Sequence, residues 1–384
     1  MNAINTSDLR PGQIFSDPVY TEGEYLLVAA QVPLRQKDID VLVSWGIEFV
    51  KTEGSLADPD VPAEIHQSED KPLKFSISDV QGNSVPYRSY KHLIEKLNMV
   101  FSSLKSGDGI EMRAIDYICI QLLQGLRDYP NNFVEYILGG EITGNELAKS
   151  SVNTAILSAM TAQELKLPNH KIHNIIAGAL LHDVGMLRLS KGITEKKGGL
   201  SEAELEQIKS HPIHTSKIVT KELFGPHEVN LIAIQHHERW DGQGYPDKLS
   251  GQAIDIGARI VSVADAFEAM VSKKSYRNSL VGYQAIKNLM ADNARRFDPA
   301  VIMAFTKIIG IYPIGSIVQL NGNIIARVVS VHSNAPMRPV VQLLTESSGK
   351  VIDPEKITTV DLLSDKTLFI KHAIDPEEYA NKNK

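Results

Sequence analysis

Two adjacent histidines and a glutamate, His236-His237-Glu238, stand where an apolar segment ends and a polar turn begins. The turn is rich in glycine, aspartate and proline and closes on Gly244-Tyr245-Pro246. Neutral imidazole nitrogens bind Zn, Fe, Mn or Ni readily, so paired imidazoles at this position predict a metal site. A similar end occurs upstream, where the apolar run 175–181 leads into His182-Asp183. A carboxylate beside an imidazole can bridge two metal ions.

The composition limits the classes of protein to which the chain can belong. Its 384 residues, 43% of them hydrophobic, are enough for two or three domains with a sizeable core. The formal net charge of −6 argues against nucleic acid or an anionic membrane as the main partner. A single cysteine, Cys119, excludes an intramolecular disulfide and suits a reducing cytoplasm. No signal-peptide layout and no apolar run of about 20 residues is present, so we expect a cytoplasmic protein without a membrane span.

The first 140 residues contain no candidate ligand of their own. Residues 1–54 read as a small α/β domain, with strands expected at 25–30 and 47–50 and a helix at 36–45. Residues 55–81 are polar, contain prolines and have no sustained period, which is typical of a linker. Residues 82–140 return to helical spacing, and we expect this helical brace to support the core or to pair with a second subunit in a homodimer. Its expected helices are 90–104, 112–126 and 132–138.

The remaining sequence changes its periodicity once. Residues 141–310 read as a series of helices without strands, which predicts an all-α domain whose ligands lie at helix ends. From residue 311 to 384 the pattern alternates or runs apolar between Asn-Gly and Pro turns, which predicts a β subdomain with strands at 315–320, 324–331 and 340–344. The expected fold class is therefore a multidomain α+β protein. Its all-α core lies between a small N-terminal α/β domain and a C-terminal β subdomain.

Six candidate metal ligands follow one another in a distinctive order. A single buried histidine is more often an ordinary core residue than a ligand, but chance assembly of the whole series is improbable. The flanking sequences Ser210-His211-Pro212 and 275–277 add to the pattern. The six residues are His182, Asp183, His211, His236, His237 and Asp265.

From about residue 141 onward, these motifs resemble the HD-GYP family, metal-dependent phosphodiesterases that cleave the bacterial second messenger cyclic di-GMP. The resemblance implies an HD-type helical core in which His182, Asp183 and Asp265 help to hold one divalent metal. Asp183, His211, His236 and His237 would hold a second, with Asp183 as the bridge. Mixed nitrogen and oxygen ligands suit Fe, Mn, Zn and Ni alike. Fe or Mn is the first expectation, and Zn or Ni is the alternative.

The same resemblance suggests residues that contact the substrate. Arg277 and Lys274 would provide positive charge for a phosphate, although a solvated charge cluster is a serious rival reading for Lys274. Gly244 permits a tight turn and Tyr245 offers a face on which a base can stack. An equally good reading makes Tyr245 a simple loop anchor. In the family the Gly-Tyr-Pro loop is also credited with contacts to diguanylate cyclases.

Two positions depart from the family pattern. The family has a histidine before its Ser-x-Asn sequence, where this chain has Ser150, a poor metal ligand. Glu146 lies at i−4 on the same helix face, and some family members with three metals carry a glutamate there. The resemblance therefore implies that Glu146 supplies an oxygen ligand; a solvated surface carboxylate is an equal alternative. The second departure is Met186, which replaces a lysine that normally lies near the substrate phosphate.

The resemblance implies a phosphodiesterase that opens cyclic di-GMP to the linear dinucleotide and further to GMP. The attacker would be a metal-bound hydroxide, and Asp183 and His182 would be the catalytic residues. The alternative is a degenerate, low-activity module that binds a nucleotide or a protein partner as part of signalling. Ser150 and Met186 favour that alternative. A third reading is an active HD hydrolase on a different phosphoester, and the intact Gly-Tyr-Pro motif argues against it.

Overall fold

The computed structural model describes residues 2–17, 19–21, 26–28, 33–34, 36–44, 49–57, 84–139, 146–194, 196, 198–272, 282–353 and 357–374. The chain divides into two compact units. The first contains residues 1–77, 281–291 and 306–384, and the second contains residues 78–280 and 292–305. The second unit is helical and carries all six candidate metal ligands, whereas the strands lie in the first.

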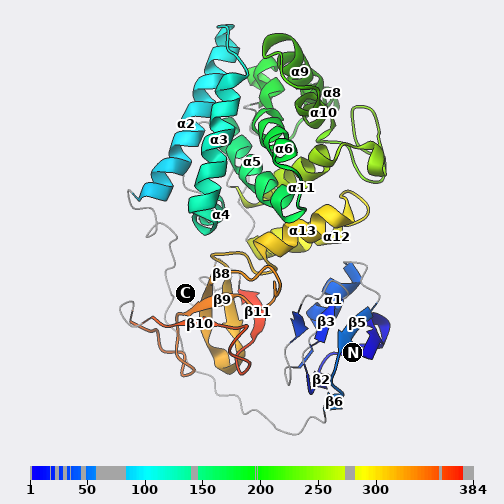
Figure 1. Ribbon diagram of the computed structural model, residues 1–384, viewed down its shortest axis with the longest axis vertical. Coiled ribbons are helices and arrows are strands. Elements are labelled where there is room, and N and C mark those ends of the chain that lie inside the picture. The colour runs from blue at the N-terminus through cyan, green and yellow to red at the C-terminus, as the bar shows by residue number, and fades with distance from the viewer. Residues whose placement is uncertain are drawn as a thin grey trace. The chain divides into compact units, whose positions relative to one another are not determined.

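The helical unit begins with α2 (Val85–Ser106), α3 (Arg113–Asp128) and α4 (Pro130–Gly139), on which the three helices expected in the brace fall. Ser84 caps α2 by accepting a hydrogen bond from the backbone N–H of Tyr87 at 3.4 Å. Gly107 ends α2 with a φ of 81°, a left-handed conformation that favours glycine. Figure 1 shows α2 and α3 running side by side.

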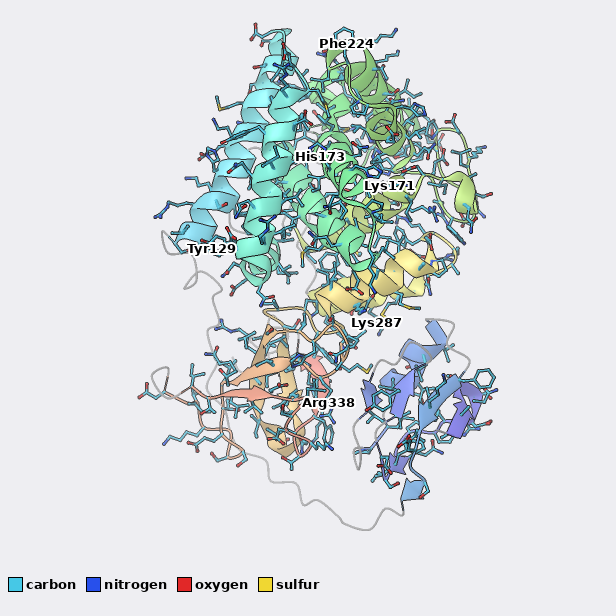
Figure 2. The ribbon with its side chains drawn as sticks, in the orientation of Figure 1. Tyr129, Lys171, His173, Phe224, Lys287 and Arg338 are labelled. Carbon is cyan, nitrogen blue, oxygen red and sulfur yellow. The ribbon has the colours of Figure 1, made fainter. Side chains whose placement is uncertain are left out.

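The centre of this unit consists of α5 (Glu146–Glu164), α6 (Asn169–Leu181), α10 (His227–Gln235) and α11 (Ile256–Val271). A side-chain carbon at Gly178 of α6 would lie 2.5 Å from Ile232 of α10, so the close approach of these helices requires glycine. His173 of α6, labelled in Figure 2, lies 3.6 Å from Asp116 of α3 (Nε2 to Oδ1). These contacts position the ends of α6 and α10, where the histidine motifs lie.

Short helical segments complete the unit, and no strand occurs among its described residues, as the sequence predicted. They are η3 (Val184–Arg188), α7 (Lys191–Thr194), α8 (Glu202–Lys209), α9 (His211–Lys217), the π-helical η4 (Ile218–Glu222), η5 (Gly251–Ala253) and α13 (Pro299–Ile309), which ends in the other unit. None of the helices in the described ranges is long and apolar enough to cross a membrane.

The N-terminal part of the other unit is a four-stranded antiparallel sheet in the order β1-β5-β3-β4 with one helix, α1 (Gln36–Ser44). The expected strands at 25–30 and 47–50 fall on β4 and β5 in their described residues, and the expected helix falls on α1. The strands are β1 (Asn2–Asn5), β3 (Val19–Thr21), β4 (Leu26–Val28) and β5 (Phe49–Thr52), with β2 (Ile14–Phe15) paired to β6 (Leu56–Ala57) and η1 (Thr6–Asp8) after β1.

The C-terminal part is a five-stranded antiparallel sheet in the order β10-β9-β8-β7-β11. Ile317, Ile325 and Leu344 form a buried cluster within it. The three expected strands fall on β7, β8 and β9, while β10 and β11 were not predicted. The strands are β7 (Ile317–Leu320), β8 (Ile325–Ser330), β9 (Val340–Leu343), β10 (Thr359–Asp361) and β11 (Ile370–Ile374), with η6 (Asn321–Asn323) between β7 and β8 and α12 (Gly282–Ala291) ahead of the sheet.

Candidate metal centre

Five of the six candidate ligands lie at or next to a helix end, as expected, whereas Asp265 lies in the middle of α11. His182 is the C-terminal cap of α6, His236 is that of α10, and His211 is the first residue of α9. Thr215 fastens α9 to the turn after α6: its hydroxyl donates to the carbonyl of His182 at 3.0 Å and accepts from the N–H of Gly185 at 2.9 Å. Any side chain at Gly185 would collide with the carbonyl of His211, 2.2 Å away, so this approach also depends on glycine.

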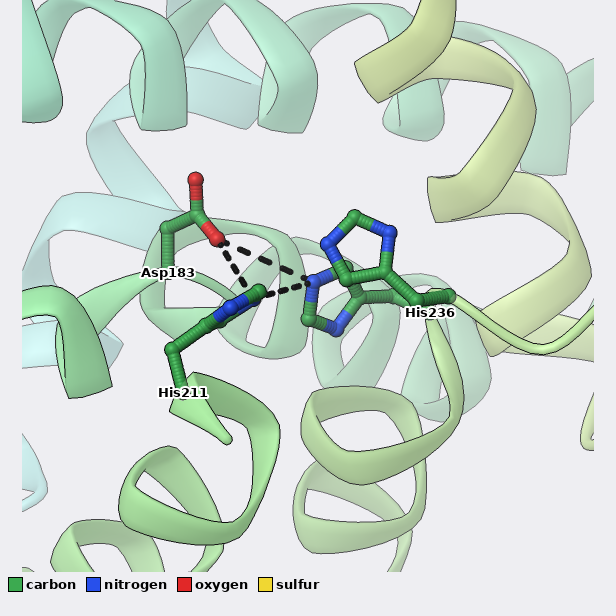
Figure 3. A group of neighbouring side chains, drawn as sticks. Asp183, His211 and His236 are labelled. Carbon is green, nitrogen blue, oxygen red and sulfur yellow. Dashed lines mark hydrogen bonds and ion pairs between the residues drawn. The ribbon is translucent and has the colours of Figure 1, made fainter. Parts of the chain in front are cut away.

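Four of the six ligands meet at one point. Asp183, His211, His236 and His237 each offer a ligand atom, and these atoms all lie within 4.8 Å of one another. The Asp183 Oδ1 atom lies 3.0 Å from His211 Nε2 and 3.7 Å from His236 Nε2, and Figure 3 shows the three side chains pointing toward one another. These are the same four residues that the family resemblance implies for the second metal, and their role as ligands stays a prediction.

Backbone carbonyls fix which ring nitrogen faces this point. The Nδ1 atoms of His182, His211 and His236 lie 2.7, 2.7 and 2.8 Å from the carbonyl oxygens of the residues three positions earlier, to which each can only donate. In a neutral imidazole the Nε2 atom then carries the free lone pair, which is the arrangement that metal-binding histidines adopt.

The facing lone pairs indicate that a cation fits here. His211 Nε2 lies 3.2 Å from His236 Nε2, and neither neutral ring would have a proton to place between them. Two lone pairs at this distance repel unless a proton or a metal ion lies between them. The donor set of three imidazoles and one carboxylate suits Fe, Mn, Zn or Ni.

His182 extends the centre toward Asp265 on α11. Its Nε2 atom is buried and has no hydrogen-bond partner among the described residues. It lies 3.5 Å from Asp183 Oδ2 and 3.5 Å from Asp265 Oδ1. Asp183 therefore faces His211 and His236 with one oxygen and His182 with the other, which is the orientation that a bridging carboxylate needs.

Burial and neighbouring charges shift the pKa values of the candidate ligands in opposite directions. Burial alone would lower the pKa of His182, but Asp183 and Asp265 raise it to about 9. Burial holds the pKa of His236 below its usual value and that of His237 well below it. Burial would raise the pKa of Asp183, yet the neighbouring imidazoles bring it well below its ordinary range. The centre thus combines ionised carboxylates with at least two imidazoles that resist protonation, as metal ligation requires.

The Gly-Tyr-Pro loop is bound to the residue that follows the paired histidines. Buried Glu238 accepts hydrogen bonds from the backbone N–H groups of Asp247 at 2.6 Å and Leu249 at 3.1 Å. A side-chain carbon at Gly244 would lie 2.4 Å from the backbone nitrogen of Arg239, so the loop can only lie here with glycine. The ring of Tyr245 stacks on that of His237. Tyr245 thus contacts a predicted ligand directly, which favours the reading of this residue as an anchor.

The Ser150 departure has a partner that sequence reasoning missed. The hydroxyl of Ser150 donates to Glu268 Oε2 at 2.6 Å, and the side-chain amide of Asn153 donates to Oε1 at 3.2 Å. Tyr90 of α2 in turn donates to Asn153 Oδ1 at 2.5 Å. Glu268 is 1% exposed and lies one turn after Asp265, a spacing that could have marked it as a second inward carboxylate. Position 150 thus binds a buried carboxylate.

The other predicted site residues are not brought to the metal centre or are not described. Glu146 is an exposed residue in the first turn of α5, and its role as a ligand stays a prediction. Met186 is half-buried in η3. Arg277 and Lys274, the predicted phosphate contacts, lie outside the described residues.

Comparison with known families matches both parts of this description. Residues 142–301 match the HD domain, and residues 317–382 match the KOW domain associated with HD domains. The first match covers every metal ligand predicted from the sequence, and the second covers the five-stranded sheet.

Curated relatives include enzymes that act on cyclic dinucleotides. The chain is 28% identical to the cyclic di-GMP phosphodiesterase PdeB of Borreliella burgdorferi, over 92% of this chain and 91% of that protein. It is 31% identical to the cyclic di-GMP phosphodiesterase PA4108 of Pseudomonas aeruginosa, over 55% of this chain and 50% of that protein. Among solved structures, Bd1817, an HDG"Y"P protein from Bdellovibrio bacteriovorus, aligns with a TM-score of 0.48 and 17% identity, over 80% of this chain and 98% of that one.

Proposed function

This chain belongs to the HD-GYP family of HD-domain proteins, and we propose that it is a metal-dependent phosphodiesterase that hydrolyses cyclic di-GMP. The product would be the linear dinucleotide and, after a second cleavage, GMP. We further propose that two divalent ions are held, with Fe or Mn preferred over Zn and Ni, and that Glu146 is the ligand through which a third would bind.

The observation that carries this proposal is that the two oxygens of Asp183 face different imidazoles. One of its oxygens faces His211 and His236, and the other faces His182, whose Nε2 atom is buried without a hydrogen-bond partner in the described structure. A carboxylate placed in this way would serve two cations. Such a pair supplies an activated water and stabilises the charge that develops on the phosphate and the leaving oxygen.

The residues of the chain would hold and orient the reacting groups. The backbone carbonyls that accept from the Nδ1 atoms fix the direction of His182, His211 and His236. Asp183 and Asp265 concentrate negative charge that must be balanced before a phosphate can approach. Arg277 and Lys274 stay the proposed phosphate contacts.

The alternative function is a degenerate module that binds a nucleotide or a protein partner with little turnover. Ser150 favoured it in the sequence, but the serine hydroxyl binds Glu268, and the four clustered ligands are all present. These contacts support the enzyme, because the second metal set does not include position 150. Contacts of the Gly-Tyr-Pro loop with diguanylate cyclases, a homodimer through the helical brace and a cytoplasmic location stay proposals.

The test is metal-dependent turnover by the full chain. Protein purified without oxygen is analysed for metal and incubated with cyclic di-GMP, and the products are separated by chromatography. We expect linear dinucleotide that disappears after chelation and returns when Fe or Mn is added. His236→Ala and His237→Ala should abolish it, whereas Lys248→Ala, an exposed change in the same loop, should not. Fully metallated protein that binds cyclic di-GMP and yields no product over a long incubation would favour the binding module.

A further inference from the structure

Arg296 lies beside the loop that carries the metal ligands, although it belongs to a segment more than 50 residues further along the chain. The backbone N–H of Trp240 donates to the carbonyl of Arg296 at 3.0 Å, and that of Asp241 donates to Arg295 at 2.9 Å. These two bonds join residues 295–296 to the turn between His237 and Tyr245. The guanidinium of Arg296 lies over the ring of Phe297, 5.0 Å from its centroid, and Phe297 is buried.

The turn to which Arg296 is bonded leads directly into the metal centre. It connects His237, one of the four clustered candidate ligands, to Tyr245, whose ring stacks on the His237 imidazole. The two backbone bonds therefore fix Arg296 beside a loop both of whose ends lie at the centre.

Arg296 differs from the other arginines around this loop in its pairing. Arg239 pairs with Asp241 at 2.7 Å, Arg259 with Asp298 at 2.6 Å, and Arg295 with Asp292. Arg296 is exposed, and it forms no ion pair with a carboxylate in the described ranges. It is thus a cation, fixed at its backbone, whose charge is available to a ligand at the edge of the centre.

We propose that Arg296 binds the phosphate of the cyclic dinucleotide that is not held in the metal centre. This inference rests on the proposed function, because a substrate with two phosphates needs a cation beyond the metal ligands. A guanidinium matches a phosphate with two parallel hydrogen bonds, and its support by the Phe297 ring reduces its freedom. This phosphate does not react, so the contact is equally strong in the bound substrate and in the transition state. It therefore contributes to substrate binding more than to the chemical step.

The experiment compares Arg296→Ala and Arg296→Lys with Arg295→Ala, a matched change at the adjacent exposed arginine. The full-length, metal-loaded proteins are assayed with cyclic di-GMP, with cyclic di-AMP as a competitor, and with bis(p-nitrophenyl) phosphate, which has a single phosphate. We expect Arg296→Ala to raise KM for cyclic di-GMP about tenfold and to leave kcat nearly unchanged. It should weaken inhibition by cyclic di-AMP to a similar degree. The rate of bis(p-nitrophenyl) phosphate hydrolysis and the metal content should stay unchanged. Arg296→Lys should recover part of the loss, and Arg295→Ala should behave as the parent.

Three results would overturn the assignment. An unchanged KM in Arg296→Ala would show that the residue does not touch substrate, and an equal loss with bis(p-nitrophenyl) phosphate would place its effect on the metal centre. A loss confined to cyclic di-GMP would mean that Arg296 reads guanine instead of phosphate. If the parent protein hydrolyses no cyclic dinucleotide, the proposed function fails, and equilibrium binding of cyclic di-GMP by the same variants still tests Arg296.

Discussion

The phenol ring of Tyr245 stacks on the imidazole of His237, with ring centroids 4.8 Å apart and an angle of 29° between the planes. The His236 and His211 rings approach His237 at 4.1 and 4.9 Å. His237 is therefore held between other predicted ligands and the tyrosine of the Gly-Tyr-Pro loop. This contact joins the loop to the metal centre, so a change in one is expected to affect the other.

Removal of the Tyr245 ring should weaken metal binding. Tyr245→Ala leaves His237 free to rotate, and loss of a group that orients a ligand typically costs about 10–100-fold in metal affinity. Tyr245→Phe keeps the stacked ring and should keep the affinity. Titration against a competing chelator measures both. If Tyr245→Ala binds metal as tightly as the parent but handles substrate poorly, the ring serves the substrate and not the ligand.

Asp183→Ala should release more metal than any other single ligand change, because one of its oxygens faces His211 and the other faces His182. Elemental analysis of the purified variants gives the number of ions per chain. Asp247→Ala is the matched control, since Asp247 is an exposed carboxylate of the neighbouring loop. A variant lacking Asp183 with the metal content of the parent would contradict the two-metal arrangement.

The residues that cluster at the candidate centre could be picked out from the sequence because their signal is local. His182 and His236 each follow an apolar helix, and His211 begins the helix that contains Pro212, so each helix end can be read from its own residues. Glu268 and Arg296 could not be found in this way. The partner of Glu268 is 118 residues away, and Arg296 reaches the loop through hydrogen bonds between distant backbone groups. Only the folded chain brings these residues together.

The same distinction explains the two strands that were not predicted. β10 is short and ends in Asp361, and β11 contains Lys371 and His372, so neither has an apolar pattern typical of a strand. β11 pairs with β7, which lies about 50 residues earlier, and its register shifts between Ile370 and His372. Pairing with an existing sheet stabilises such strands, and that partner is not visible in their own sequence.

Ser150→Ala should lower stability without removing metal. The buried carboxylate of Glu268 would keep Asn153 as a donor but lose the hydrogen bond from Ser150, and a hydrogen bond to a charged group is worth about 1.5–3 kcal/mol. Urea denaturation and metal analysis measure the two effects separately. Glu146→Ala is the comparison on the same helix, because Glu146 is exposed. Release of metal by Glu146→Ala would support its role as a ligand, whereas release by Ser150→Ala would show that position 150 serves the centre.

Acid should weaken the start of α8 through Glu204. Ser201 and Glu204 form a reciprocal capping box, and Lys196 bonds the Glu204 carboxylate at 2.7 Å. The hydrogen bond from Lys196 and those from Ser201 lower the pKa of Glu204 to about 2. A carboxylate whose pKa is lower in the folded state stabilises it above the unfolded pKa of about 4.3, and the benefit is lost as the pH falls toward the folded value.

The difference in stability between the parent and Glu204→Gln should therefore be constant near neutral pH and shrink as the pH falls below about 4.3. Urea denaturation midpoints at a series of pH values measure it. Glu206→Gln is the matched control, because Glu206 lies on the same exposed helix and bonds Lys209 but takes no part in the cap. A Glu204→Gln difference that stays constant down to pH 3 would show that the carboxylate charge does not stabilise this helix. The remaining difference would then come from hydrogen bonds whose strength does not depend on the charge of Glu204.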